Sequence, residues 1–166
     1  MVSIGLVNPK SPANVGAVLR AAGCFGAAAV FYTGERYARS ARFHTDTKNA
    51  GLTIPLTGVN SLAEILAQGT RLVCVEFVEG ATPLPAYRHP DQALYVFGPE
   101  DGTLSQELIH RADDVVYVPT IGCLNLAATV NVVLYDRLAK AGPMVANDEL
   151  IRNSRDRNNR LRIGAG

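Results

Sequence analysis

The chain has 166 residues, of which 48% are hydrophobic and 19% charged, and 16 Lys and Arg residues against 15 Asp and Glu residues leave a net charge of +1. This length suits one self-sufficient domain spanning residues 1–166, and the apolar content excludes disorder while no apolar run reaches the roughly 18 residues of a membrane span. The near-neutral charge excludes a protein that coats nucleic acid by bulk attraction, but it leaves room for a local basic surface.

Short apolar runs of strand length recur along the chain, at 2–7, 28–32, 72–77, 94–97 and 115–118. They are continuous rather than alternating, which is typical of strands covered on both faces. Helical patterns lie between most of them. The sequence therefore predicts an α/β domain whose mostly parallel sheet is flanked by helices.

Four helices are expected from start and stop signals. They cover 15–22 after Ser11 or Asn14, 62–67 before Gly69, 104–111 after Thr103, and 124–141 before Gly142 and Pro143. The last of these is apolar around much of its circumference, so it is expected to have two buried faces.

Three irregular segments are predicted to carry function, because binding residues concentrate in loops. The segment 33–51 lacks periodicity, the segment 79–91 is interrupted by prolines, and a basic, part-helical tail runs from about residue 147. The first mixes cations with aromatic residues, a combination that can pair phosphates and stack bases, although a simply solvated loop is an alternative. Its candidate RNA-binding residues are Arg36, Arg39, Arg42 and Lys48.

Three motifs follow predicted strands, where open α/β sheets place ligands. The first is 8–26, which contains Asn14 and Arg20; the second is Phe97-Gly98-Pro99-Glu100-Asp101-Gly102; the third is 118–126. Each has an ordinary explanation when taken alone: a solvated Arg20, a tight turn, an Asn125 that caps a helix and a small buried Cys123.

Together, the three motifs resemble those of the SpoU (TrmH) branch of the SPOUT methyltransferases. The matching positions are Asn14, Gly16, Arg20, Phe25 and Gly26 in the first motif, 97–100 with Gly102 in the second, and 119–125 with the 131–136 helix in the third. The resemblance covers about 2–140. Thr120 and Cys123 depart from the Met and Ser common in the family, and the third loop is short.

The resemblance implies a C-terminal trefoil knot that forms the pocket for S-adenosylmethionine, and a homodimer that completes the site. It also implies methyl transfer to a ribose 2′-hydroxyl of RNA, with tRNA favoured because the chain carries no separate RNA-binding module. The implied catalytic residues are Arg20, Asn14, Glu100 and Asn125. The implied cofactor-binding residues are Glu76, Phe77, Gly98, Val118, Cys123 and Leu124.

A guanidinium is a poor base, so we expect Arg20 to hold a phosphate and stabilise charge on the 2′ oxygen. Alternatives are a ribosomal RNA 2′-O-methyltransferase, a non-catalytic RNA-binding descendant and a flavodoxin-like binder of small molecules. No Gly-x-Gly-x-x-Gly or phosphate-binding loop is present. Three widely spaced cysteines and no signal-peptide pattern favour the cytoplasm. His44, His89 and His110 lack metal-ligand spacing and are expected to face solvent, so no metal is assigned.

Overall fold

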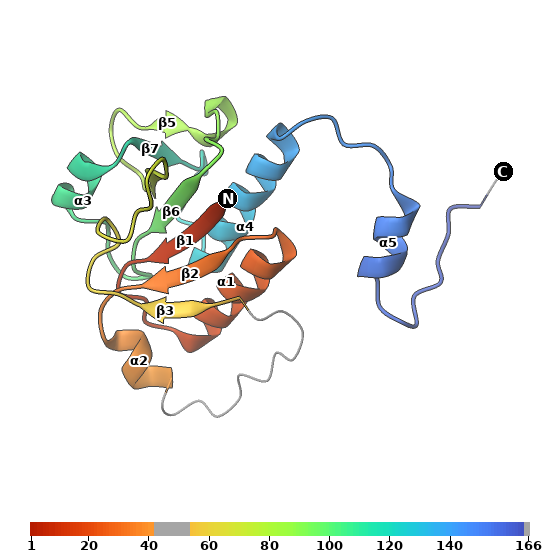
Figure 1. Cartoon of the computed structure of the whole chain (residues 1–166), viewed down its shortest axis with the longest axis horizontal. Coiled ribbons are helices and arrows are strands. Elements are labelled where there is room, and N and C mark those ends of the chain that lie inside the picture. Colours follow the sequence, from red (N-terminus) through yellow and green to blue (C-terminus); the bar gives the residue numbers. More distant parts are fainter. Residues whose placement is uncertain (42–53, 165–166) are drawn as a thin grey trace.

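The computed structural model describes residues 1–41 and 54–164. Its centre is a seven-stranded sheet in the order β3-β2-β1-β6-β4-β7-β5, and every neighbouring pair is parallel (Figure 1). The predicted α/β class with a mostly parallel sheet is confirmed. The strands are β1 (Val2–Leu6), β2 (Ala29–Tyr32), β3 (Leu56–Gly58), β4 (Arg71–Val75), β5 (Thr82–Pro83), β6 (Ala93–Phe97) and β7 (Asp114–Tyr117).

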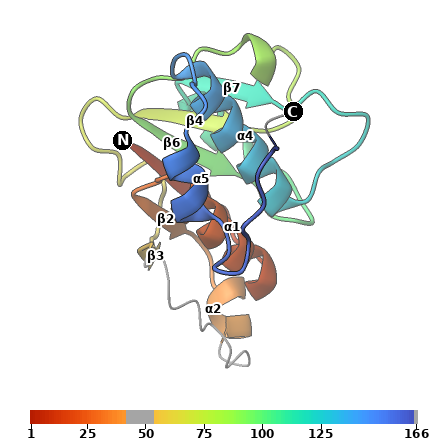
Figure 2. The ribbon, with the colours of Figure 1, turned by 90° about the vertical axis from the view of Figure 1, so that its right-hand side faces the viewer.

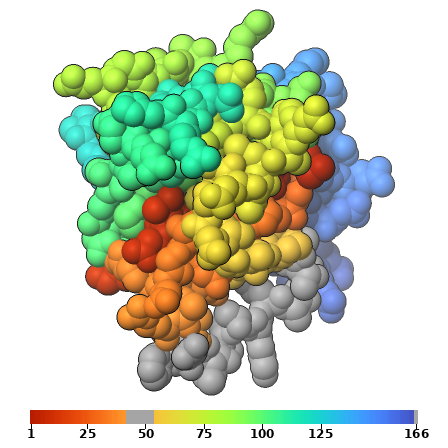
Figure 3. All heavy atoms as spheres, turned by 60° about the vertical axis from the view of Figure 1, so that its left-hand side comes forward, coloured from red at the N-terminus to blue at the C-terminus, as the bar shows by residue number. Residues whose placement is uncertain are grey.

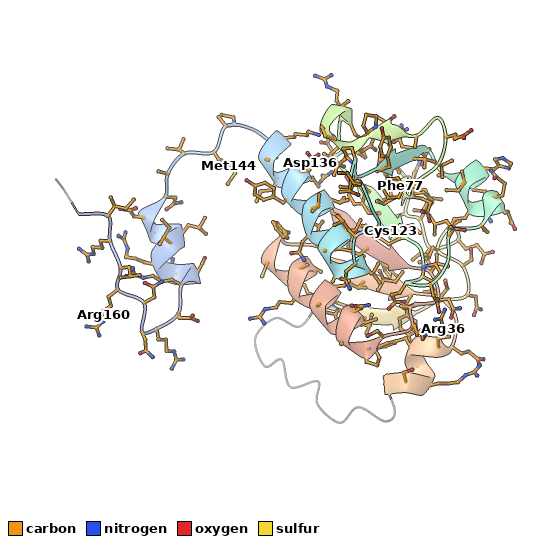
Figure 4. All side chains as sticks on the ribbon, turned by 180° about the vertical axis from the view of Figure 1, so that it is seen from behind. Arg36, Phe77, Cys123, Asp136, Met144 and Arg160 are labelled. Carbon is orange, nitrogen blue, oxygen red and sulfur yellow. The ribbon has the colours of Figure 1, made fainter. Side chains whose placement is uncertain are left out.

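Helices cover both faces of this sheet. They are α1 (Pro12–Cys24), α2 (Arg36–Ala41), the 3-10 turn η1 (Leu84–Ala86), α3 (Gln106–Arg111), α4 (Leu126–Lys140) and α5 (Asp148–Ser154). On one face α1 and α4 pack side by side over the larger apolar core (Figure 4). On the other face α3 packs against the segment 59–66 over a second core, and Figure 3 shows the two, teal and yellow, in contact.

The register of the central strands brings their carboxyl ends to one edge. Leu6 at the end of β1 lies opposite Phe97 at the end of β6, and Phe97 lies opposite Val75 at the end of β4. The loops that follow these three strands therefore start side by side. This edge, called here the carboxyl edge, is where the three sequence motifs meet.

Two polar caps begin the helices next to this edge. Ser11 caps α1, because its hydroxyl accepts a hydrogen bond from the Asn14 backbone N–H at 3.3 Å. The sequence left either Ser11 or Asn14 as the cap of this helix. The cap is Ser11, and the side chain of Asn14 is free for other contacts. Asn125 caps α4, where its Oδ1 accepts from the N–H groups of Ala127 and Ala128.

Helix α4 buries one face against the sheet and exposes another. Val130, Val133 and Leu134 are buried, whereas Tyr135 is 60% exposed and Leu138 is 43% exposed. The second apolar face that the sequence predicts to be buried is exposed in the single chain, and its burial stays a prediction for the homodimer. One apolar stripe of this helix has no cover among the described residues of the single chain.

The predicted helix at 62–67 is absent. The segment forms turns instead, and Leu62 packs so closely over Gly5 that a Cβ on that glycine would meet its side chain at 3.0 Å. A helix of fewer than two turns has little stability of its own, so burial of Leu62 decides the conformation.

Two other expectations differ from the structure in detail. The segment 33–51 is not wholly irregular, because α2 lies within it, and β5 lies in the proline-rich segment 79–91. The edge strands β3 and β5 went unpredicted because two or three residues give no apolar run, and pairing with β2 and β7 creates them. The other elements lie within three residues of their predicted bounds, and the largest difference is the start of α1 at Pro12 rather than Val15.

The basic tail is partly helical, as predicted, through α5. It leaves the end of α4 and stands off the body of the molecule in Figure 1, and Figure 2, which views the molecule from that side, draws α5 in front of the body. None of its helical residues is buried. Within the described ranges, no helix combines the length and apolar character that crossing a membrane requires.

Candidate active site

A cavity of about 280 Å³ opens at the carboxyl edge of the sheet. Its walls come from the loops that follow β4, β6 and β7 and from the first turns of α1 and α4. The sequence-predicted residues that line it are Asn14, Glu76, Phe77, Gly98, Glu100, Val118, Cys123, Leu124 and Asn125. Nine of the ten residues assigned to catalysis or cofactor binding thus meet in one place, and Arg20 is the exception.

A chain of side-chain hydrogen bonds joins the three motifs. Asn125 Nδ2 donates to Asn14 Oδ1 at 3.0 Å, and Asn14 Nδ2 donates to Glu100 Oε1 at 3.1 Å. Each of these residues comes from a different motif, and 111 residues separate Asn14 from Asn125. These hydrogen bonds connect the start of α1, the start of α4 and the loop after β6.

Glu100 also holds the backbone that leads into α1. Its two carboxylate oxygens accept from the N–H of Lys10 at 2.8 Å and the N–H of Ser11 at 3.0 Å. Burial acts to raise the pKa of Glu100, but the hydrogen bonds from Asn14, Lys10 and Ser11 outweigh it and hold the pKa below its usual value. Glu100 is therefore a carboxylate near neutral pH. Its hydrogen bonds go to the segment that leads into the N-terminus of α1.

Glu76 plays a similar part on the other side of the cavity. Its carboxylate accepts from the N–H groups of Phe77 and Leu104, each at 3.0 Å. A Cβ on Gly98 would lie 3.1 Å from Glu76 Oε2, so glycine leaves the space that this carboxylate occupies. The Phe77 ring is half exposed at the cavity and lies 5.9 Å from the ring of Tyr117.

The third loop closes tightly in spite of its departures from the family pattern. Thr120 Oγ1 donates to the carbonyl of Gly122 at 2.7 Å, which fixes the turn. Cys123 is exposed in the cavity, so its explanation as a small buried residue is wrong. Backbone groups and apolar side chains, with few charges, make up this wall.

Sequence reasoning assigned no role to several further residues that line the cavity, among them Tyr117, Thr120 and Thr129. Thr129 lies one helical turn beyond Asn125 and donates from its hydroxyl to the Asn125 carbonyl at 3.0 Å. The i, i+4 spacing from a motif residue on a helix is the signal that could have found it.

Arg20 does not line the cavity. It is exposed on α1, six residues and roughly 9 Å along the helix axis from Asn14, and on a different side of the helix. Among the residues that the structure describes, it has no ion pair and no side-chain hydrogen bond.

The predicted RNA-binding residues are only partly described. Arg36 makes a bidentate ion pair with Asp101, at 2.8 to 2.9 Å, and Arg39 pairs with Glu35 on the same helix. The pair raises the pKa of Arg36 and lowers that of Asp101 through the shared hydrogen bonds. Arg42 and Lys48 lie outside the described residues. The described half of this group is thus occupied by carboxylates.

The cavity combines a half-exposed aromatic ring, apolar side chains and fixed backbone donors and acceptors. Such a wall suits the flat ring system of a ligand held by backbone groups. Within residues 1–41 and 54–164, no three His, Cys, Asp or Glu side chains are grouped so as to hold a metal ion.

Comparison with known proteins agrees with this geometry. A sequence profile of the SpoU rRNA Methylase family matches residues 1–135. A tRNA/rRNA methyltransferase of Mycobacterium leprae, described as uncharacterized, is 29% identical over 139 residues, which are 79% of this chain and 45% of that protein. This chain therefore spans about half the length of that relative.

Solved structures share the fold. One from work on 2-OH methylation of C/U34 on tRNA is 26% identical with a TM-score of 0.68, and the match covers 84% of this chain and 90% of that one. The SpoU methyltransferase AviRb from Streptomyces viridochromogenes, solved in complex with AdoMet, is 22% identical with a TM-score of 0.67, over 83% of this chain and 57% of that one.

The parallel sheet, its flanking helices and the cavity at its carboxyl edge define a protein with the SPOUT methyltransferase fold. The family match then specifies the branch. The chain belongs to the SpoU rRNA Methylase family.

Proposed function

We propose that this protein transfers a methyl group from S-adenosylmethionine to a ribose 2′-hydroxyl of RNA, and that its substrate is a tRNA. The observation that carries the proposal is the convergence of all three motifs on one cavity through the Asn125–Asn14–Glu100 hydrogen-bond chain. Support for this choice of hydroxyl and RNA comes from the relative linked to 2-OH methylation of tRNA. Its chain is 90% covered by this match, so it is also of similar extent.

The cavity fits the cofactor that AviRb holds. Gly98 has no side chain, so it leaves room in one wall for the Glu76 carboxylate. Phe77 offers an aromatic surface for the adenine, and the 118–124 loop presents backbone groups. We propose that Glu76, Phe77, Gly98, Val118, Cys123 and Leu124 hold S-adenosylmethionine. When bound, the cofactor supplies a methyl group on a positively charged sulfur. The residues of this chain then have to position the acceptor oxygen in line with it.

Arg20 is proposed to bind the phosphate beside the target ribose and to stabilise negative charge as the 2′ oxygen loses its proton. Its guanidinium cannot act as a base at neutral pH, but it offers bidentate hydrogen bonds that suit a phosphate. Asn14 and Asn125 act through the loops they join. Because Arg20 lies outside the cavity of its own chain, we propose that it acts in the cavity of a second copy.

The test is methyl transfer from labelled S-adenosylmethionine to tRNA and, separately, to ribosomal RNA, followed by nucleoside analysis. Wild type is expected to produce a 2′-O-methylated nucleoside in tRNA, and Arg20→Ala should reduce turnover at least about 100-fold while cofactor binding is kept. Arg20→Lys should not restore it, since an ammonium lacks the planar fork. Methylation of a base, or full activity of Arg20→Lys, would refute the assignment.

A mixing experiment tests the action of Arg20 across two copies. Arg20→Ala is mixed with an equal amount of a variant whose own cavity is blocked, Cys123→Trp. If Arg20 acts on the partner, random exchange gives half mixed dimers with one complete site each, and activity returns to about one quarter of wild type. If the mixture stays inactive although subunits exchange, Arg20 does not act across the interface.

Methylation of ribosomal RNA is the second candidate function. It is supported by the Mycobacterium leprae relative, whose name includes both tRNA and rRNA. The same assay separates the two, because tRNA and ribosomal RNA are offered in separate reactions. A non-catalytic RNA-binding descendant would bind both the cofactor and RNA without transfer.

A further inference from the structure

The structure sorts the arginines of this protein into two groups. Those on the body are mostly engaged by acceptors of the same chain. Arg71 pairs with Asp114 at 3.0 Å, and Arg137 donates to the carbonyls of Pro90 and Asp91. Arg36, Arg39 and Arg111 also have carboxylate partners. Cations held in this way are poorly placed to bind a further anion.

The second group lies in the C-terminal arm, defined here as residues 142–164. It carries Arg152, Arg155, Arg157, Arg160 and Arg162. In the described part of the chain, none of these five has a carboxylate oxygen within ion-pair distance; Arg155 donates only to the carbonyl of Leu161. On the body, Arg20, Arg88 and Arg137 share this property within the described ranges, and Arg137 is engaged instead by two backbone carbonyls and the Tyr95 hydroxyl.

Charge is concentrated in the same stretch. The eleven residues 152–162 hold five arginines and one acidic residue, Asp156, which is a net charge of +4. The arm also holds Asp148 and Glu149, so it carries +2 as a whole, and because the whole chain carries +1 the body is net negative at −1. The other members of the stretch are mainly Asn and Ser, whose side chains hydrogen-bond to phosphate and sugar oxygens.

The arm is held away from the body and far from the cavity of its own chain. Asn125 at the start of α4 lines the cavity, whereas the arm begins beyond Lys140 at the far end of this 15-residue helix, about 22 Å away. Figure 1 shows α5 standing clear of the sheet, and Figure 4 shows Arg160 on the side of the arm away from the body.

We propose that the C-terminal arm binds the phosphate backbone of the RNA substrate at a distance from the nucleotide that is methylated. Unpaired arginines on an exposed segment release counterions when they meet phosphates, which makes this binding strong and independent of sequence. A contact about 22 Å from the cavity spans several base pairs. The substrate is therefore a folded RNA and not a short single strand. This inference rests on the proposed function, because it deepens the account of its substrate.

A second copy of the chain is the other occupant that the arm could meet, because Leu150 and Ile151 on α5 are more than half exposed. The net charge decides for RNA. A body that is net negative and whose arginines are already paired attracts the arm less than a polyanion does, and five unpaired guanidinium groups have no acceptors on the exposed apolar stripe of α4.

The experiment measures the affinity of the full chain for two ligands, unfractionated tRNA and an eight-nucleotide RNA. Each affinity is measured at salt concentrations between about 0.05 and 0.3 M, a range chosen because phosphate contacts respond strongly to salt there. The variant Arg157→Gln, Arg160→Gln, Arg162→Gln is compared with the same three positions changed to Lys. A charge-matched control changes three exposed cations of the body to which no RNA contact is assigned, Arg71→Gln, Arg88→Gln, Arg111→Gln.

The arm Gln variant should bind tRNA at least about 10-fold more weakly at low salt, and its slope of log affinity on log salt should be about 2 smaller. The Lys variant and the body control should stay near wild type, and binding of the octamer should not change. In methyl transfer the Gln variant should raise KM for tRNA while kcat at saturation is kept.

Unchanged affinity and slope, or an equal loss in the body control, would overturn the proposal. So would a Gln variant that lowers the assembly mass in sedimentation while the tRNA slope stays the same, because the arm would then bind a second copy. These results differ from failure of the proposed function, which would appear as no methyl transfer by wild type.

Discussion

Helix α4 is fixed by polar side chains at both ends, and the two ends differ in how complete their hydrogen bonding is. At the carboxyl edge, Asn125 belongs to the chain with Asn14 and Glu100, beside an open cavity. At the opposite end, Asp136 accepts from His89 at 2.8 Å and from Lys140 at 2.6 Å. We call the second group the His89 cluster; it also includes Tyr95 and Arg137.

The His89 cluster satisfies its members from within the protein. The His89 side chain is only 4% exposed, which corrects the expectation that it faces solvent. Its Nδ1 lies 2.6 Å from the Tyr95 hydroxyl, and Lys140 also donates to the carbonyls of Leu84 and Tyr87. Arg137 donates to Tyr95 and to two carbonyls of the 79–91 segment. The cluster locks that segment against α4.

This difference in hydrogen bonding indicates that the two ends of α4 have different roles. Where polar atoms remain beside open space, as at Asn14 and Asn125, they are available to a ligand or to loops that surround one. Where they pair with one another and with backbone carbonyls, as in the His89 cluster, they stabilise the fold, although His89, Arg137 and Lys140 also line a second cavity of about 570 Å³. Changes at the two ends should therefore affect different measurements.

The largest expected effect is on catalysis at the carboxyl edge. Glu100→Ala removes the acceptor for Asn14 and for the N–H groups of Lys10 and Ser11, so the loops around the cavity lose their alignment. We expect methyl transfer to fall about 100-fold, because small displacements at a reacting centre have effects of that size. Steady-state rates measure this. Glu107→Ala, at an exposed position of α3, is the matched control, and an equal fall there would contradict the interpretation.

The second-largest expected effect is a loss of stability when the His89 cluster, at the C-terminal end of α4, is changed. Asp136→Ala leaves His89 and Lys140 without their shared acceptor, and we expect the free energy of unfolding to fall by about 2 kcal/mol. Turnover at 20 °C, a temperature chosen to keep the variant folded, should stay within about twofold of wild type. Urea denaturation gives the first quantity. A variant that is as stable as Asp148→Ala, which alters an exposed residue of α5, would show that the cluster contributes little.

The two ends should also separate by pH. Burial lowers the pKa of His89 below its usual 6.5, against the opposing effect of Asp136, while Lys140 and Arg137 add to the lowering. Below about pH 6.5, His89 binds a proton in the unfolded chain but not in the native state. Its contribution to the free energy of unfolding is therefore fully present above that pH and is lost as the pH decreases. The slope approaches about 1.4 kcal/mol per pH unit.

His89→Gln should reduce this slope between pH 6.5 and the lowered pKa, as measured by urea denaturation at several pH values, whereas His110→Gln should leave it unchanged. Tyr95 and Tyr87, which also face the ring, stay protonated throughout this range because burial raises the pKa of both. Glu100 has a lowered pKa, so its contribution is lost only as the pH falls below about 4.5. Identical slopes for wild type and His89→Gln would contradict the assignment.

The smallest effect concerns the ion pair between Arg36 and Asp101. Half of the Asp101 side chain is exposed, and exposed pairs contribute little because water screens them. Asp101→Asn should lower the free energy of unfolding, measured by urea denaturation, by only a small fraction of the loss expected for Asp136→Ala. A loss as large as that of Asp136→Ala would mean that α2 is coupled to the carboxyl edge more strongly than this geometry indicates.

The central strands and the two long helices could be predicted because their signals are local. Continuous apolar runs mark β1, β4 and β6, and caps mark the starts of α1 and α4. The short elements could not be, since β3 and β5 exist through pairing with a neighbour and the 60–70 turns through burial of Leu62. The knot stays a prediction from the family resemblance.

The candidate site was predictable through the family motifs and not through the residues taken singly. Asn14, Glu100 and Asn125 each have an ordinary explanation, and Asn125 is indeed a helix cap. Their contact across 86 to 111 residues is a property of strand register, which the sequence does not display. Arg36 illustrates the reverse, because its partner Asp101 lies 65 residues away and composition alone made it a candidate for RNA.

The central claim is that the cavity at the carboxyl edge binds S-adenosylmethionine, and calorimetric titration of three proteins tests it most directly. Cys123→Trp places an indole inside the cavity, whereas Ile121→Trp adds the same group two residues away at a fully exposed position that does not line it. Wild type and Ile121→Trp should bind the cofactor alike, and Cys123→Trp should bind at least about 100-fold more weakly, a loss of about 2.7 kcal/mol. Equal binding by all three, or no binding by wild type, would contradict the account.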